Sequence, residues 1–171
     1  MELQLAEKLL KLIEGRIFHT TTGSAFIKII DDGSIKPNKG EYPNRFPQSV
    51  SSISHHFGFI SLFDFTGLTL ENILEDESLK WLHFFVDQTP LNIAIQLNRD
   101  FLESKLVRFE DLIENDIRRL YRIPNVEVWS RESIPIEAFE QFLIVYNSDW
   151  RTIQIVNDPC LLVKQINQSN T

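Results

Sequence analysis

The nearly unbroken apolar stretch FGFISLFDF, at residues 57–65, constrains the fold more than any other part of the sequence. Successive side chains of a strand point to opposite faces, so a strand that is apolar at neighbouring positions buries both faces. We therefore expect a central β-strand here, with other elements packed on each side. Asp64, the single charged residue in the stretch, is expected to cap a turn at its end.

The amount of apolar material fits one domain built around such a strand. Hydrophobic residues make up 43% of the 171 positions, and the chain contains 13 Phe. At this length roughly 70% of the unfolded chain's surface becomes buried on folding, so a core can form without disulfides. We expect a single domain over residues 1–171, with a core rich in aromatic rings.

The net charge and the N-terminal sequence limit which partners and which cellular compartment we expect for the protein. The net charge of −7 argues against a broad phosphate-binding surface, although it leaves room for a small basic pocket. Charged residues interrupt residues 1–16 where a secretory leader would be apolar, and no stretch reaches the roughly 20 apolar residues of a membrane span. Cys160 is the single cysteine, so we expect a small buried hydrophobe there. These features predict a cytoplasmic protein without a membrane segment.

Apolar periodicity and turn residues predict helices and strands in a mixed order, without a regular βαβ repeat. Helices are expected at residues 2–14, 24–32, 70–75, 99–106 and 109–121. Strands are expected at residues 17–20, 57–65, 91–97, 126–130, 141–147 and 152–156. Residues 79–86 fit either type, and residues 37–54 read as a long polar loop. Ser24 is expected to cap the second helix and Gly33 to end it, and the whole order predicts the α+β class.

Several common catalytic patterns are absent from the sequence. The glycines at positions 15, 23, 33, 40, 58 and 67 lie too far apart for a phosphate-binding loop. His55 and His56 are neighbours, and neighbouring side chains on a strand point to opposite faces, so they make a poor metal pair. No second cysteine completes a thiolate site. We therefore expect no bound metal.

Three separated segments remain, and together they resemble the ADP-ribosyltransferase-like domains. IFHTTTGSAFIKIIDDGSIKPN, residues 17–38, resembles their opening strand with His-Thr and the helix that follows it. VEVWSRESIPIEAFEQFLIV, residues 126–145, resembles the closing segment of the DarT-like branch, and residues 57–65 are similar to the aromatic strand beneath nicotinamide. The resemblance implies a split, twisted β core of mixed or antiparallel strands with flanking helices. It also implies NAD in the cleft and relatives in bacterial toxin–antitoxin and phage-defence systems.

The resemblance also implies roles for individual residues. His19 would hold the adenine-side ribose with Thr20 beside it, and Glu127 would be the catalytic carboxylate. The nicotinamide pocket would be lined from the aromatic strand, by Ser61, Phe63 and Phe65. This arrangement requires His19 and Glu127 to open onto one nucleotide-sized groove.

The chemistry of these residue types fits the roles, although each has a structural alternative. A fixed carboxylate stabilises the positive charge that develops on the ribose as nicotinamide leaves, and a neutral imidazole can both donate to and accept from a ribose diol. His19 could instead be a hydrogen-bonded structural histidine, and Glu127 could lie on the solvent face of an alternating strand.

Two departures from the family pattern keep a second function open. Thr66 and Gly67 stand where an arginine is expected, and the aromatic strand lacks the expected tyrosine, while Tyr42 and Tyr121 lie elsewhere. The first function is an NAD-dependent ADP-ribosyltransferase, a glycosyltransferase that modifies nucleic acid or protein and is paired with an antitoxin or another partner protein. The alternative is a degenerate module of the same fold that binds a nucleotide or a partner without turnover. An RNA 2′-phosphotransferase is a third, weaker reading.

Overall fold

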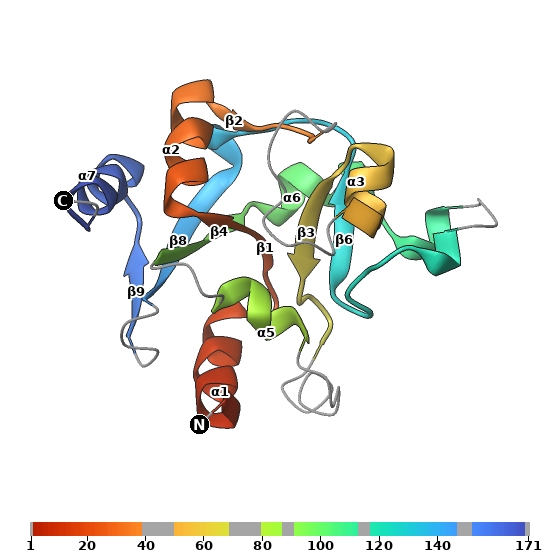
Figure 1. Ribbon diagram of the computed structural model, residues 1–171, viewed down its shortest axis with the longest axis horizontal. Coiled ribbons are helices and arrows are strands. Elements are labelled where there is room, and N and C mark those ends of the chain that lie inside the picture. The colour runs from red at the N-terminus through yellow and green to blue at the C-terminus, as the bar shows by residue number, and fades with distance from the viewer. Residues whose placement is uncertain are drawn as a thin grey trace.

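A seven-stranded sheet runs through the centre of the molecule, with helices on both faces (Figure 1). The computed structural model describes residues 2–38, 50–68, 80–86, 91–112, 117–146 and 152–169. The strand order is β5-β6-β3-β1-β4-β8-β9, and every neighbouring pair is antiparallel. The strands are β1 (Ile17–Thr22), β3 (Ile60–Asp64), β4 (Leu91–Leu97), β5 (Leu106–Val107), β6 (Glu127–Ser130), β8 (Phe139–Tyr146) and β9 (Ile153–Val156). A second, two-stranded sheet joins β2 (Ser34–Ile35) to β7 (Ile134–Pro135).

One face of the central sheet, here the α1 face, buries an aromatic core. Phe18 and Phe63 lie on this face and pack with α1 (Glu2–Ile13) and α5 (Lys80–Phe85). Figure 1 shows both helices below the sheet. The amphipathic pattern of α1 places its buried leucines and isoleucine toward the strands, at Leu9, Leu10 and Ile13.

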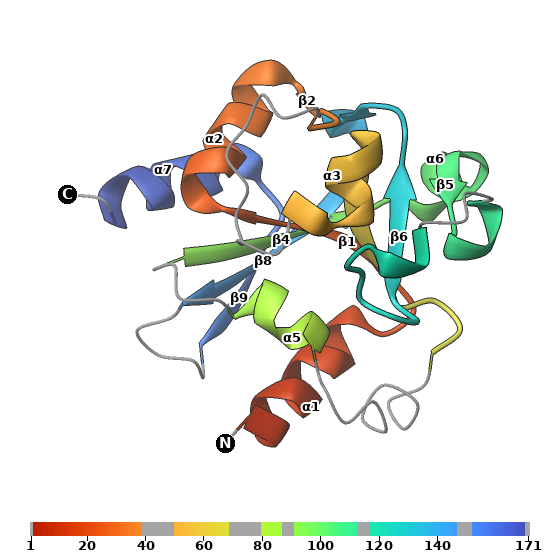
Figure 2. The same ribbon diagram turned by 45° about the vertical axis from the view of Figure 1, so that its right-hand side comes forward.

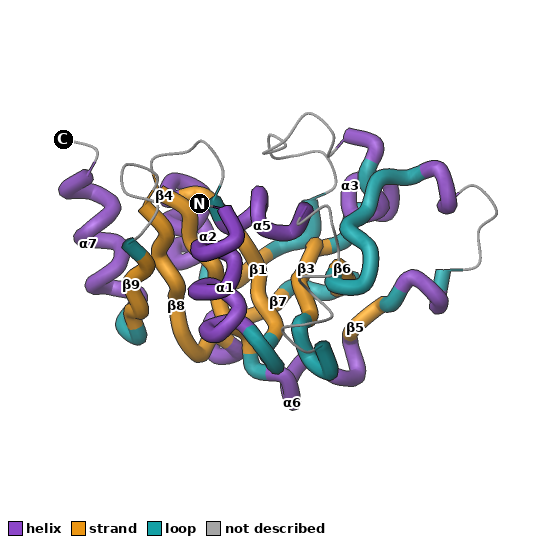
Figure 3. The backbone as a smooth tube through the Cα atoms, turned by 90° about the horizontal axis from the view of Figure 1, so that it is seen from below, coloured by secondary structure: helices purple, strands orange, loops and turns teal. Residues whose placement is uncertain are grey.

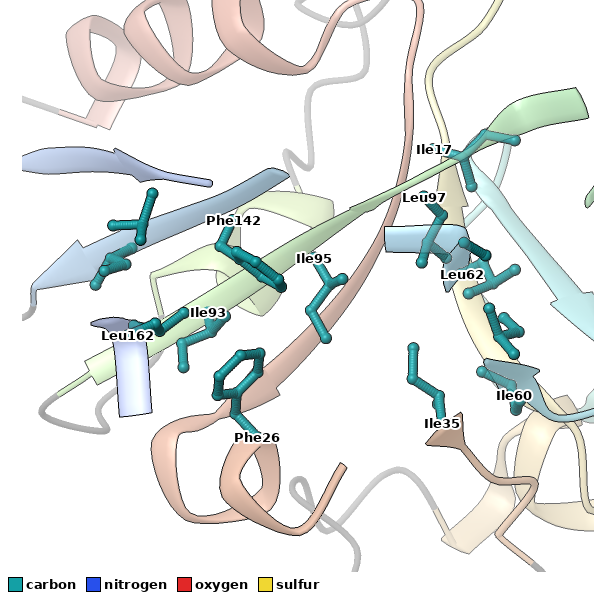
Figure 4. Packing of buried hydrophobic residues seen from close by; sticks show 14 of the residues in the cluster. Ile17, Phe26, Ile35, Ile60, Leu62, Ile93, Ile95, Leu97, Phe142 and Leu162 are labelled. Carbon is teal, nitrogen blue, oxygen red and sulfur yellow. The ribbon is translucent and has the colours of Figure 1, made fainter. Parts of the chain in front are cut away.

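The opposite face, here the α2 face, buries a mainly aliphatic core. It lies under α2 (Gly23–Asp32) and α7 (Pro159–Ser169), which Figure 1 shows above the sheet. Figure 4 shows Phe26 of α2 facing Phe142 of β8, with ring centroids 5.3 Å apart. Alternation of side chains along each strand divides the two cores, since neighbouring residues such as Phe18 and Ile17 belong to different cores.

The consecutive threonines at the end of β1 continue the strand and then start α2. The Thr22 hydroxyl accepts a hydrogen bond from the Ala25 N–H at 3.3 Å, so Thr22 caps the helix and the predicted cap at Ser24 is wrong. Gly33 has φ 68° and donates its N–H to the Ile30 carbonyl, which confirms the predicted end of the helix.

The aromatic stretch at residues 57–65 is only partly a strand. β3 covers Ile60–Asp64, whereas Ile53–Phe57 form the helix α3. Ser52 caps this helix by accepting from the His55 N–H at 3.2 Å, and Gly58 ends it in the left-handed conformation with φ 65°. The prediction of a loop up to residue 54 is therefore wrong at its end, and residues 39–49 of that segment lie outside the described residues.

Most other predicted elements are confirmed, with shifted boundaries. β4, β6, β8 and β9 match the predicted strands, and α5 shows that residues 80–85 of the ambiguous segment are helical. The two helices predicted at 99–106 and 109–121 are wrong in length. α6 covers only Arg99–Leu102, and three-residue 3₁₀ turns follow at Glu103–Lys105, Phe109–Asp111 and Ile117–Arg119. The predicted helix at 70–75 lies outside the described residues.

α7 is a helix that the sequence analysis did not predict. Pro159 occupies its first position, where a proline ring suits the helical backbone and the missing N–H is not needed. Leu162 and Ile166, one turn apart, are buried against the α2 face. Cys160 is exposed, so the expected burial of this thiol is wrong.

β1 is the boundary between a continuous and a split part of the sheet. Residues 17–22 of β1 pair with residues 92–97 of β4 along the whole strand. In the described register with β3, residues 17 and 18 pair with residues 64 and 63, and the two strands then stop pairing. His19 is the first residue of β1 beyond that pairing. From His19 onward, β1 is held by its ladder with β4 on one side and lies beyond the described register with β3 on the other.

The architecture is an α+β fold with an antiparallel central sheet, which confirms the predicted class. None of the helices in the described ranges combines the length and the apolar composition that a membrane span requires.

Candidate functional site

Ser61 of β3 joins the two residues that the sequence analysis placed in one site. His19 Nδ1 lies 3.0 Å from the main-chain oxygen of Ser61, and Ser61 Oγ donates to Glu127 Oε1 at 2.7 Å. The three residues come from β1, β3 and β6, which are neighbours in the sheet and lie side by side in Figure 1. Figure 2 brings the β6 side of the sheet forward. The fold therefore brings His19 and Glu127 within one intervening residue of each other.

The Glu127 carboxylate accepts hydrogen bonds from three donors. Besides Ser61, the Ile123 N–H donates to Oε2 at 2.7 Å and the Trp129 Nε1–H donates to Oε1 at 3.2 Å. An ionised carboxylate accepts at both oxygens, whereas an amide accepts at one and donates at the other. Glutamine in this position would point its NH₂ at either the Ile123 or the Trp129 N–H. The hydrogen-bond donors around this position therefore suit a carboxylate better than an amide.

A tight turn before β6 presents one of these donors to the carboxylate. The Glu127 N–H donates to the Ile123 carbonyl at 3.1 Å, and the Val126 N–H donates to the Pro124 carbonyl at 2.8 Å. Asn125 takes a left-handed conformation with φ 67°, which Asn tolerates better than most residues. The turn holds the Ile123 N–H over the Glu127 side chain and fixes the orientation of the carboxylate.

Burial raises the pKa of Glu127 above its ordinary value, because the charged form loses contact with water. The hydrogen bonds from Ser61, Ile123 and Trp129 and the charge of Arg122 oppose this shift without cancelling it. The pKa of Tyr121 is also raised, first by its own burial and then by the negative charge of Glu127. The site thus combines a carboxylate that resists ionisation with a tyrosine and an arginine in its electrostatic range.

His19 stands where β1 leaves β3. A carbonyl oxygen only accepts, so Nδ1 carries the hydrogen in this contact. His19 pairs with Ile95, whose side chain belongs to the α2 face, whereas Glu127 pairs with Phe63 of the α1 face. The two side chains therefore leave the sheet on opposite faces, and Ser61 connects them. A shared groove would have to reach both faces at the split, and it stays a prediction.

The aromatic residues predicted to line a nicotinamide pocket are core residues in this structure. Phe63 and Phe65 are 1% and 0% exposed, and their rings pack against aromatic residues of α5, namely Trp81, Phe84 and Phe85. Rings buried this deeply offer a nicotinamide almost no accessible surface, and that contact stays a prediction. Thr20 is partly buried on the α1 face and pairs with Ala94 of β4.

An ion pair between a buried carboxylate and a half-exposed arginine lies at the far end of β3. Asp64 is 4% exposed, accepts from the N–H and the hydroxyl of Thr66, and pairs with Arg108 Nη2 at 3.1 Å. The contact with Thr66 confirms that Asp64 caps a turn. Arg108 comes from the segment after β5, so the structure brings an arginine to the end of the aromatic strand although the sequence offers none directly after it.

Sequence reasoning missed several residues around Glu127. Trp129 had a usable signal, because residues two apart on a strand share a face and the sequence reads Glu-Val-Trp. Arg122 and the Ile123 N–H had no such signal in the sequence, because only the turn at residues 123–127 brings them close to the Glu127 carboxylate. Glu132, the other carboxylate of this segment, is exposed and lies 3.6 Å from Lys105.

Comparisons of the chain with protein families, curated proteins and solved structures find no match. Across the described ranges, no three His, Cys, Asp or Glu side chains are grouped as a metal site would require.

Proposed function

We propose that this chain is an NAD-dependent ADP-ribosyltransferase in which Glu127 is the catalytic carboxylate. The observation that carries the proposal is the connection from His19 through Ser61 to Glu127 across three neighbouring strands. These are the residues that the motif resemblance assigns to NAD, and nothing in their sequence separation requires them to meet.

The split between β1 and β3 supports the same proposal. The resemblance implies a split β core with NAD in its cleft, and in the described register β1 and β3 part after residue 18. NAD would lie at this split, with the adenine-side ribose toward His19 and the nicotinamide-side ribose toward Glu127. Because the His19 and Glu127 side chains start on opposite faces of the sheet, the nucleotide would have to pass between β1 and β3, beyond residue 18 of β1 where the two strands no longer pair.

The chemistry asks Glu127 to act as a carboxylate. When the bond between nicotinamide and ribose breaks, the leaving base takes the bonding electrons and positive charge develops on the sugar carbon. The acceptor then forms the new bond to that carbon and loses its proton. An ionised Glu127 would stabilise the sugar charge, accept a hydrogen bond from a ribose hydroxyl and take the acceptor's proton. The donors at Ser61, Ile123 and Trp129 would hold it in one orientation.

The motif resemblance extends the proposal to the setting of the reaction. The protein would act in the bacterial cytoplasm as a toxin or phage-defence effector, with nucleic acid or protein as the acceptor. An antitoxin or another partner protein would control it.

Incubation with NAD labelled in its ADP-ribose part, alone and with protein or nucleic-acid extracts, tests the activity. We expect label transfer and nicotinamide release, and we expect Glu127→Gln to lower the rate by about 100-fold or more. Glu132→Gln is the matched control, since it removes an exposed carboxylate five positions along the chain and should leave the rate unchanged. The thermal unfolding of both variants should be recorded with the activity, because Gln at 127 also disturbs the hydrogen bonds.

A specific observation also favours the degenerate alternative, a nucleotide- or partner-binding module without turnover. Both oxygens of the Glu127 carboxylate already accept hydrogen bonds within the chain, from the Ser61 hydroxyl, the Ile123 N–H and the Trp129 Nε1–H. Saturable NAD binding without nicotinamide release would support this alternative. The complete absence of NAD binding by the folded protein would overturn both functions.

A further inference from the structure

The two edges of the central sheet are protected to different degrees. β5 at one edge has two residues and lies between Lys105 and Arg108. A short strand with flanking charges resists pairing with another chain. β9 at the other edge is longer, and residues 152–157 around it contain neither a charged residue nor a proline. The molecule therefore leaves one edge without the usual features that prevent association.

The middle of β9 is open to solvent. Gln154 and Ile155 are both exposed, and Ile155 keeps 49% of its surface accessible. Ile155 lies on the α1 face because it pairs with Leu143 of that core, whereas α7 packs on the α2 face through its buried side chains. Figure 3 shows β9 as the last strand of the sheet on the side of α7. The helix therefore leaves Ile155 uncovered.

We propose that β9 pairs with β9 of a second copy of this chain, so that two sheets join into one. A two-fold axis places a strand antiparallel to its own copy, and all neighbouring strands of this sheet are antiparallel. The interface would be isologous, with the same residues contributed by each copy.

The faces of the side chains restrict the register of this pairing, and the chemistry of the opposed residues favours one register. Directly opposed residues of an antiparallel pair share a face, and Ile153 and Ile155 lie on the α1 face while Gln154 lies on the α2 face. An axis at Gln154 sets Ile155 opposite the partner's Ile153 and sets the two Gln154 amides opposite each other. An axis at Ile155 would instead set the two Ile155 side chains opposite each other and oppose Gln154 with the partner's Val156, an apolar residue. Both registers cover the exposed isoleucine with apolar surface, but only the first pairs the Gln154 amide with another amide.

Charge leaves this edge as a surface where two copies can meet without local repulsion. Each chain carries a net charge of −7, so two copies repel each other over most approaches. The uncharged segment at residues 152–157 opposes no like charges when it meets itself. The pairing involves only four residues from each chain, so we expect a reversible dimer with a dissociation constant of about micromolar or weaker.

Sedimentation across a wide range of protein concentrations tests the proposal. We expect the native chain to pass from monomer to dimer as concentration rises, and we expect Ile155→Lys to weaken this association at least about 10-fold by placing a charge on the edge. Leu161→Lys is the matched control, because Leu161 is a similarly exposed apolar residue on α7 and should leave the association unchanged.

Three results would overturn the proposal. They are a monomer at every concentration, a dimer that Ile155→Lys leaves intact, and a dimer that both lysine variants weaken equally. Circular dichroism of each variant confirms that the fold is retained, and the exposed position of Ile155 predicts that it is. The experiment needs no NAD, so its outcome is independent of the proposed transferase activity.

Discussion

The two sides of β1 differ in both register and chemistry. Toward β4 the ladder is continuous over residues 17–22, and the strands are packed between apolar cores on both faces. Toward β3 the described ladder ends after residue 18, and hydrogen bonds among His19, Ser61 and Glu127 link the strands beyond it. Sheet pairing and burial hold the first side, whereas side-chain hydrogen bonds hold the second.

This difference indicates where a ligand could enter without opening the core. Burying a Val, Leu, Ile or Phe side chain contributes about 1.5–3 kcal/mol, whereas a typical internal hydrogen bond contributes about 1 kcal/mol net. Polar groups at the β3 side can exchange their internal partners for those of a ligand at small cost. The β4 side offers no such exchange, because its stability comes from apolar contacts on both faces of the sheet.

The largest expected effect in this comparison comes from Asp64, which lies at the end of β3 that still pairs with β1. Asp64→Ala removes a buried carboxylate and leaves the Thr66 N–H, the Thr66 hydroxyl and the Arg108 guanidinium without this acceptor. We therefore expect a loss of about 3 kcal/mol in the free energy of unfolding. Arg108→Ala should lower the free energy of unfolding by less than about 1 kcal/mol, because the Arg108 side chain is about half exposed and Asp64 keeps its hydrogen bonds to Thr66. Denaturant unfolding of both variants measures the difference. Equal losses would mean that the ion pair, and not the Thr66 cap, holds this end of β3.

A smaller effect is expected from pH, through the raised pKa of Glu127. Below the ordinary pKa of a glutamate both states hold the proton, and this group contributes no pH dependence. As pH rises above that value, the unfolded chain releases the proton while the folded chain retains it, so stability falls until the folded pKa is passed. Glu127→Gln removes this slope. The measurement is the free energy of unfolding of both proteins against pH, and a difference that is flat or rises with pH would contradict the assignment.

The sequence predicted the β4 side of the molecule better than the β3 side. Alternating or continuous apolar runs indicated β4 and β8, because burial on the sheet faces alone determines those strands. α3 was missed because its start depends on the side chain of Ser52 and its end on a left-handed Gly58, inside a segment that reads as a polar loop. α7 was missed although Leu162 and Ile166 lie one turn apart.

The candidate site shows the same limit. The sequence could select His19 and Glu127 as residue types in familiar motifs, but the bond through Ser61 depends on where two strands stop pairing. The alternative that Glu127 lies on a solvent face is disfavoured by its three internal donors, and only the turn at residues 123–127 explains one of them. Hydrogen bonds of this kind depend on positions to within a fraction of an ångström, which periodicity in a sequence does not encode.

We propose that NAD binds at the split beside β1, and calorimetric titration of NAD into His19 variants is the sharpest test of this binding. His19→Asn retains an N–H that can donate to the Ser61 carbonyl but lacks the second ring nitrogen, whereas His19→Ala lacks both. We predict that each variant raises the dissociation constant for NAD by about 10-fold, or ~1.4 kcal/mol, while His83→Ala on the exposed face of α5 leaves it unchanged. A folded His19→Asn protein that binds NAD as tightly as the native chain would contradict the claim.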